Sequence, residues 1–175
     1  MNTLRKIVMI TAALALGACT NALDGPGAGD GLSGDSVDLT AADTVVPGSA
    51  ADPTSLAYFQ QTVGDRVLFE VDQATLTAAG RATLNAQAAW LQQNAGYSVI
   101  IEGYADEQGT REYNLALGAR RANSAREYLM SQGVPAGRLK TVSYGKERPI
   151  EVCSEENCYS KNRRAVTVLA GALTG

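Results

Sequence analysis

Residues 103–122 read GYADEQGTREYNLALGARRA, and this stretch organises the rest of the chain. It follows an apolar run, residues 97–102, that is typical of a strand, and it passes through an acidic turn into a segment with helical spacing. The turn places Asp106 at the strand end, and the helix carries Arg121. Such a pair can bind a zwitterion, because the carboxylate accepts from an ammonium and the arginine fork donates two parallel hydrogen bonds to a carboxylate. The pattern favours a binding site over an active site.

Composition excludes several function classes. The 175 residues contain no histidine, which rules out Ser-His-Asp triads, Cys-His dyads and histidine-ligated zinc within this sequence. The formal charge of −3 and the lack of a basic stripe predict no nucleic-acid partner. We expect no cofactor, no metal site and no catalytic residue. The length suits one ordinary domain and a smaller segment.

The first 18 residues are typical of a secretory signal, with Arg5 and Lys6 before the apolar residues 7–16. That apolar run is shorter than the roughly 20 residues that a helix needs to cross a bilayer. Residues 16–19, Leu-Gly-Ala-Cys, look like the bacterial lipobox and predict lipidation of Cys19. Ordinary cleavage beside an unrelated cysteine is the alternative. Thr20, rather than an aspartate, favours the outer membrane, with the protein facing the periplasm.

A tether is expected over residues 19–53. From residue 20 onward it is rich in Gly, Ala, Asp and Ser and contains no Lys or Arg. Such a segment buries too little apolar surface to offset the entropy of ordering it, so we expect disorder. A loosely packed N-terminal subdomain is the alternative. The folded domain is then predicted to occupy residues 54–175.

Alternating elements define the predicted fold. After a helical lead-in and a strand, two helix–strand units follow, and then a polar loop and a last strand. Strand–helix–strand units of this kind are right-handed and parallel. The order β-α-β-α-β-β predicts an α/β (α+β) two-layer sandwich with one small mixed sheet. We expect the lead-in at 54–63, strands at 66–71, 97–104, 138–144 and 164–170, and helices at 77–94 and 110–132.

Taken singly, the site residues have simpler interpretations. Asp106 can be a turn acid before a helix, and Arg121 can be a surface arginine whose stem lies on the sheet edge. The second arginine pair, residues 163–164, leads the last strand, and we expect it to be structural, paired with Glu102 or Glu147.

The two cysteines near the C-terminus lie in the segment Cys-Ser-Glu-Glu-Asn-Cys. Their spacing differs from the Cys-x-x-Cys redox motif, and the chain lacks the partners that a zinc site needs. In an oxidising compartment a local disulfide between Cys153 and Cys158 is the expected outcome.

The stretch at 103–122, the run VSYGKERP at 142–149 and the run KNRRA at 161–165 resemble the OmpA-like peptidoglycan-binding domain. The resemblance covers about residues 55–172. It implies binding of the peptide stem of peptidoglycan at meso-diaminopimelate, whose free end carries an amine and a carboxylate. By position it implies that Asp106 takes the ammonium and Arg121 the carboxylate. The remaining implied pocket residues are Asn114 and Leu117 on the helix, and Val71 and Asp72 after the first strand.

The resemblance also implies biological context. It points to a lipid-anchored outer-membrane protein that works with TolB and other Tol proteins, maintains outer-membrane integrity and supports invagination during cell division, without catalysis. A cell-wall anchor outside the Tol system is one alternative. Another is a wall-degrading carboxylate enzyme that uses Asp106 with Glu102 or Glu107, although nothing in the pattern positions a water or a nucleophile.

Overall fold

The computed structural model describes residues 45–152 and 154–172. The predicted signal segment, the lipidation site Cys19, most of the predicted tether and Cys153 lie outside these described residues. Their assignments therefore stay predictions. Within the two described ranges, no helix is both long and apolar enough to cross a membrane.

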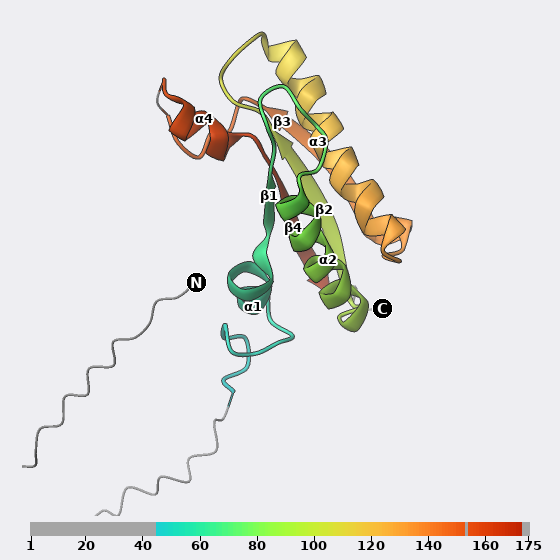
Figure 1. Ribbon diagram of the computed structural model, residues 1–175. Helices are drawn as coiled ribbons and strands as arrows, with labels where there is room; N and C mark the ends of the chain where they lie inside the picture. The colour runs from blue at the N-terminus through green and yellow to red at the C-terminus, as the bar shows by residue number, and fades with distance from the viewer. Residues whose placement is uncertain (1–44, 153, 173–175) are drawn as a thin grey trace, which may run out of the picture. The chain divides into compact units, whose positions relative to one another are not determined.

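A mixed four-stranded sheet forms one layer of the domain (Figure 1). Its order is β1-β4-β2-β3, in which β2 runs parallel to β3 while β4 is antiparallel to β1 and β2. Two long helices, α2 and α3, cover one face, and this confirms the predicted two-layer α/β sandwich. The strands are β1 (Arg66–Leu68), β2 (Tyr97–Tyr104), β3 (Leu139–Gly145) and β4 (Arg164–Ala172); the helices are α2 (Ala78–Gln93) and α3 (Arg111–Ser131).

Both long helices begin at threonine caps. The Thr77 side chain accepts a hydrogen bond from the backbone N–H of Gly80 at the start of α2, and the Thr110 side chain accepts one from Tyr113 at the start of α3. Each bond satisfies a backbone donor that has no partner inside the helix. The caps explain why the predicted helix starts agree with the structure to within a residue.

An aromatic cluster closes the core at the amino end of β2. The Phe59 ring lies 4.9 Å from the Trp90 ring, which lies 5.3 Å from the Tyr97 ring. Trp90 Nε1 donates to the carbonyl of Pro53 at 2.7 Å. Residues 45–53 form hydrogen-bonded turns, so ordered structure begins before the predicted boundary at residue 54. The lead-in then consists of α1 (Leu56–Tyr58) and the π-helical turn η1 (Phe59–Gly64).

Two glycines allow α3 to approach β2 closely. A Cβ atom on Gly103 would lie 1.8 Å from the carbonyl oxygen of Gly118, and one on Gly118 would lie 2.4 Å from Ser143 Oγ. No side chain larger than hydrogen fits at such distances without moving the helix. This contact fixes the height of α3 above the sheet, and with it the side chains that α3 points toward the carboxyl end of β2.

Two features differ from the sequence prediction. Strand β1 ends at Leu68 instead of residue 71, because the chain turns away at residues 70–73, where the Gln73 N–H bonds the Glu70 carbonyl. A short helix, α4 (Glu156–Asn162), lies at the same end of the sheet and was not predicted; the 3-10 turn η2 (Ala136–Arg138) precedes β3. The buried Asn162 holds α4 in place, since its side chain bonds the Ile150 N–H and the Glu107 carboxylate.

Candidate functional site

A pocket of about 250 Å³ lies at the carboxyl end of β2. Its walls come from the turn after β1, the loop between β2 and α3, and the first turns of α3. It contains five of the six ligand-binding residues predicted from the sequence: Val71, Asp72, Asp106, Asn114 and Leu117. The other lining residues are Gln108, Gly109 and Tyr113. Residues 46 positions apart in the chain thus meet in one cavity.

Asp106 is buried, with 7% of its surface exposed. One carboxylate oxygen accepts from the backbone N–H of Gln108 at 3.3 Å. The other oxygen pairs with Arg163 Nη1 at 3.2 Å. Asp106 is therefore a fixed acceptor at the pocket floor, and not an exposed turn acid.

Asn114 provides a second acceptor. It is 1% exposed, and its Nδ2 donates to the Gln108 carbonyl at 2.7 Å. Its Oδ1 is buried and has no hydrogen-bond partner among the described residues. A buried polar atom without a partner is costly, and such atoms in native proteins commonly mark places where a ligand or water binds.

Arg121 lies beneath the pocket and does not line it. It is fully buried, and its guanidinium donates to three backbone carbonyls, those of Glu70, Gln73 and Tyr104, at 2.8–3.1 Å. Burial lowers the pKa of Arg121 to about 10, opposed by the nearby negative charge of Asp106. The side chain thus holds the turn after β1 against the end of β2. The ion-pair partner of Asp106 is Arg163 and not Arg121.

The opposite wall is the turn that carries Val71 and Asp72. Val71 exposes its apolar side chain, with 54% of its surface accessible. Asp72 adopts a left-handed backbone conformation, with φ of 56°, which Asp tolerates better than most residues. The Tyr113 hydroxyl donates to the Asp72 carboxylate, and this bond raises the pKa of Tyr113. This contact links the wall to α3 across the pocket mouth.

The second arginine pair forms different contacts from those predicted. Arg163 pairs with Asp106 and with Glu156 of α4, instead of Glu102 or Glu147. The guanidinium of Arg164 lies 3.7 Å from the centre of the Tyr104 ring, and its nitrogens donate to backbone carbonyls. Both arginines are buried and bonded within the fold, which agrees with a structural role, and Arg163 also contacts the pocket residue Asp106.

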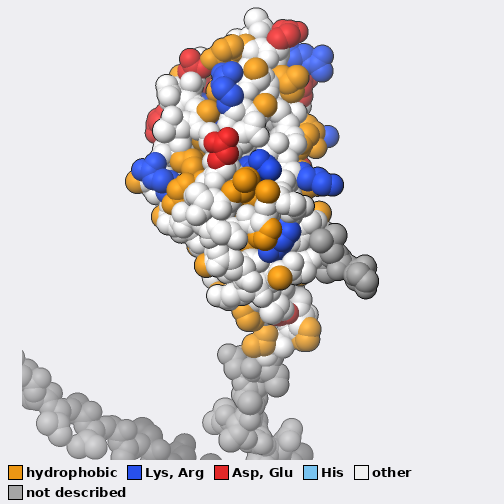
Figure 2. Space-filling model, turned by 90° about the vertical axis from the view of Figure 1, so that its right-hand side faces the viewer, with side chains coloured by type: hydrophobic (Ala, Val, Ile, Leu, Met, Phe, Trp, Pro, Cys, Tyr) orange, Lys and Arg blue, Asp and Glu red, His pale blue; other side chains and the backbone are white. Residues whose placement is uncertain are grey.

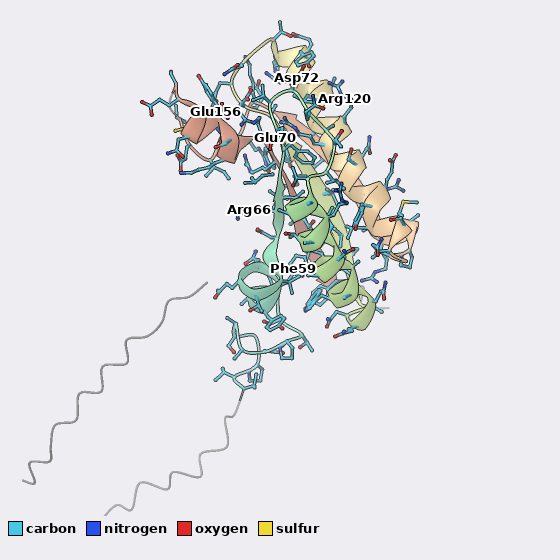
Figure 3. All side chains as sticks on the ribbon, viewed as in Figure 1. Phe59, Arg66, Glu70, Asp72, Arg120 and Glu156 are labelled. Carbon is cyan, nitrogen blue, oxygen red and sulfur yellow. The ribbon has the colours of Figure 1, made fainter. Side chains whose placement is uncertain are left out.

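Sequence reasoning missed Tyr113, Arg163 and Glu156 as parts of this region. Figure 3 shows Glu156 on α4, Glu70 beyond the end of β1 and Asp72 nearest to α3, in that order across the carboxyl end of β2. Glu156 lies in the helix that the sequence did not predict. Cys158, in the same helix, is part of a disulfide, whereas its predicted partner lies outside the described residues.

The described residues also form other depressions, and one of about 280 Å³ is lined in part by Glu156 and Arg163. A wider depression of about 700 Å³ runs beside α3 and contains none of the predicted site residues. On the face shown in Figure 2, positive, negative and apolar side chains are interspersed without a continuous basic stripe. Within the described ranges, no group of three or more acidic or cysteine side chains is placed to hold a metal ion.

Known proteins resemble this chain along most of its length. Residues 68–163 match the model of the OmpA family. A peptidoglycan-associated lipoprotein of Agrobacterium fabrum is 48% identical over 95% of this chain and 88% of its own length. One from Brucella melitensis is 53% identical over 75% of this chain and 79% of its own.

A solved structure agrees with the sequence matches. The crystal structure of the peptidoglycan-associated lipoprotein from Burkholderia pseudomallei is 34% identical, with a TM-score of 0.61, and covers 69% of this chain and 98% of its own. Strands β2 and β3 and the residues that line the pocket fall inside the matched family region. The chain therefore belongs to the OmpA family and, within it, to the peptidoglycan-associated lipoproteins.

Proposed function

We propose that the pocket binds the free end of meso-diaminopimelate in the peptide stem of peptidoglycan. One observation carries the proposal: beside the Asp106 carboxylate, the buried Oδ1 of Asn114 has no partner in the part of the chain that the structure describes, and the third polar wall of the pocket is Asp72. Three acceptors around one small cavity suit an ammonium group, which has three donors and no acceptor.

The carboxylate of the same ligand finds positive charge below the pocket. Arg121 bonds three backbone carbonyls and does not line the pocket, so its contribution to a bound carboxylate is its positive charge. Its charge acts through a dry interior, where electrostatic attraction is stronger than in water. Val71 and Leu117 supply apolar contact for the methylene chain that joins this charged end to the rest of the peptide stem.

We further propose that the protein is anchored in the outer membrane through lipid on Cys19 and faces the periplasm. The relatives that match over most of the chain are named lipoproteins, which supports this anchoring. Proteins of this family are structural and not catalytic, so the site binds its ligand without transforming it. The segment between Cys19 and the domain acts as a tether in this proposal, and Cys153 is the disulfide partner of Cys158.

A role with TolB and other Tol proteins in outer-membrane integrity and division extends this proposal. Its support is the similarity to peptidoglycan-associated lipoproteins over 95% of the chain. Co-purification of TolB with the tagged protein from cells would support it. Normal wall binding without TolB in the eluate would favour the alternative, a cell-wall anchor outside the Tol system.

Sedimentation with purified sacculi tests the peptidoglycan site. The detergent-solubilised full chain should sediment with sacculi, and Asp106→Asn should stay in the supernatant. A second test variant, Arg121→Ala, removes the buried positive charge below the pocket. Its matched control is Arg120→Ala, because Arg120 is the exposed neighbour on the same helix. Circular dichroism would verify that each variant is folded. Equal sedimentation of a folded Asp106→Asn variant would refute the assignment, and a wild-type protein that stays in solution would refute the function.

A further inference from the structure

We propose that Glu156 of α4 tunes the pocket from outside it: by pairing with Arg163, it leaves the negative charge of Asp106 available to the ammonium of the ligand. Glu156 would be a positioning residue that sets specificity for an ammonium-bearing ligand without touching it. This inference rests on the proposed function and adds a residue outside the pocket lining.

The geometry shows one guanidinium shared by two carboxylates. Arg163 Nη1 lies 3.2 Å from an oxygen of Asp106 and 3.3 Å from an oxygen of Glu156. Its Nη2 bonds the other oxygen of Glu156, so that pair is bidentate. Its Nε donates to the Phe69 carbonyl at 3.1 Å. Arg163 therefore connects α4, the floor of the pocket and the strand that leads into its outer wall.

The balance of charge explains why the sharing matters. Two buried guanidiniums, those of Arg121 and Arg163, lie next to the pocket carboxylates of Asp72 and Asp106. Without Glu156 the charges of these four groups sum to zero, which weakens their attraction for an incoming ammonium. With Glu156 the group carries one excess negative charge. Asp106 can then bind a cation although it is already paired with Arg163.

Glu156 is suited to this role because its place is fixed while its side chain stays in water. The Glu156 side chain is 63% exposed, whereas that of Arg163 is 3% exposed. The helix that carries it is held by the buried Asn162, which bonds Glu107, and by the disulfide of Cys158. The hydrogen bond from Arg163 lowers the pKa of Glu156, so this residue is charged at neutral pH.

The test compares two variants against two ligands. Glu156→Gln removes the charge that faces Arg163. Glu155→Gln removes an equal charge from the exposed neighbour, which forms no ion pair among the described residues. One ligand is a soluble stem peptide ending in meso-diaminopimelate. In the other, 2-aminopimelate replaces that residue, which keeps the terminal carboxylate and removes the terminal ammonium.

Calorimetry on the full chain should show that E156Q weakens binding of the diaminopimelate peptide roughly fivefold, as expected for one unit charge several ångströms away near a protein surface. Binding of the aminopimelate peptide should stay unchanged, and E155Q should alter neither affinity. Glu156→Asp, which keeps the charge, should recover part of the loss.

Each other outcome has a distinct meaning. If wild type does not prefer the diaminopimelate peptide, the proposed function fails. If wild type prefers it and E156Q behaves like E155Q, the role of Glu156 is refuted while the function stands. An equal loss for both peptides would show that Glu156 only supports the fold, which also refutes this inference. If E156Q does not fold, Glu156→Asp is tested in its place. A Glu156→Asp variant that prefers the diaminopimelate peptide as strongly as wild type does would then refute the role of Glu156.

Discussion

The two ends of the sheet are each held by an arginine that binds three backbone carbonyls. At the carboxyl end of β2, Arg121 donates to the carbonyls of Glu70, Gln73 and Tyr104. At the amino end, Arg138 donates to those of Leu91, Asn94 and Tyr97, at 2.8–2.9 Å. The bonding pattern is the same, but Arg121 is fully buried while Arg138 is partly exposed.

Their surroundings differ more than their bonds. Arg121 is influenced by the charges of Asp106, Asp72 and Arg163, whereas burial is the one cause that lowers the pKa of Arg138. Under the proposed function, Arg121 also serves a binding site, because carboxylates and a cavity lie beside it. The comparison therefore separates what an arginine does for the fold from what it does for a ligand.

The largest effect is expected for Arg121→Ala. Three carbonyls lose their donor and a cavity opens in a buried place, so the free energy of unfolding should fall by on the order of 4 kcal/mol. Urea unfolding followed by circular dichroism measures this loss. Arg120→Ala should stay within about 0.5 kcal/mol of wild type. A loss for Arg121→Ala no larger than that for Arg138→Ala would contradict the difference between the two ends.

The second largest effect is expected for Gly118→Ala, which should lower the free energy of unfolding by about 3 kcal/mol, because the added Cβ would press α3 away from β2. The shift would also displace Asn114 and Leu117, so sedimentation with sacculi should weaken in the same variant. Gly137→Ala is the matched control at the amino end of β2, since nothing lies within 4 Å of its added Cβ. If Gly118→Ala were as stable as Gly137→Ala, the close helix–strand contact would not be what sets the pocket geometry.

Arg138→Ala should lower the free energy of unfolding by about 2 kcal/mol. The loss is smaller than for Arg121→Ala because water can reach some of the carbonyls that lose their donor. Binding to sacculi should remain within twofold of wild type, because the pocket lies at the other end of β2. Parallel unfolding and sedimentation measurements check both statements. A binding defect in folded Arg138→Ala would show that the two ends are coupled.

The smallest effect is a pH dependence confined to the site. The folded-state pKa of Glu156 lies below its ordinary value of 4.5, owing to Arg163. Its contribution to stability is therefore present above pH 4.5 and is lost as pH falls through the folded-state pKa. Wild type should lose stability across this acid window more steeply than Glu156→Gln. Equal slopes in pH-dependent unfolding would mean that the Arg163 pair contributes nothing measurable.

The sequence predicted the parts of the fold and site that depend on local patterns. Helical spacing indicated α2 and α3, and the strand-to-helix stretch contains Asp106 and Asn114, which meet in the pocket. Local patterns do not predict contacts between residues that lie far apart in the chain. The Gln73 carbonyl is 48 positions from Arg121, and nothing in the pattern shows that the two meet. The sequence did not predict the position of Glu156, because its helix spans only seven residues between irregular segments.

The ordered lead-in enters the domain at the amino end of β2, where Pro53 and Thr54 are bonded by Trp90 and Tyr97, while the pocket lies at the carboxyl end. Eight residues of β2 separate the two, which is roughly 25 Å. A pull between a membrane anchor and a wall-bound ligand would run along the strands. It would load the β1–β4 hydrogen bonds in shear, all at once, instead of opening them one after another. Under the proposed function, the domain would therefore bear tension as a mechanical link.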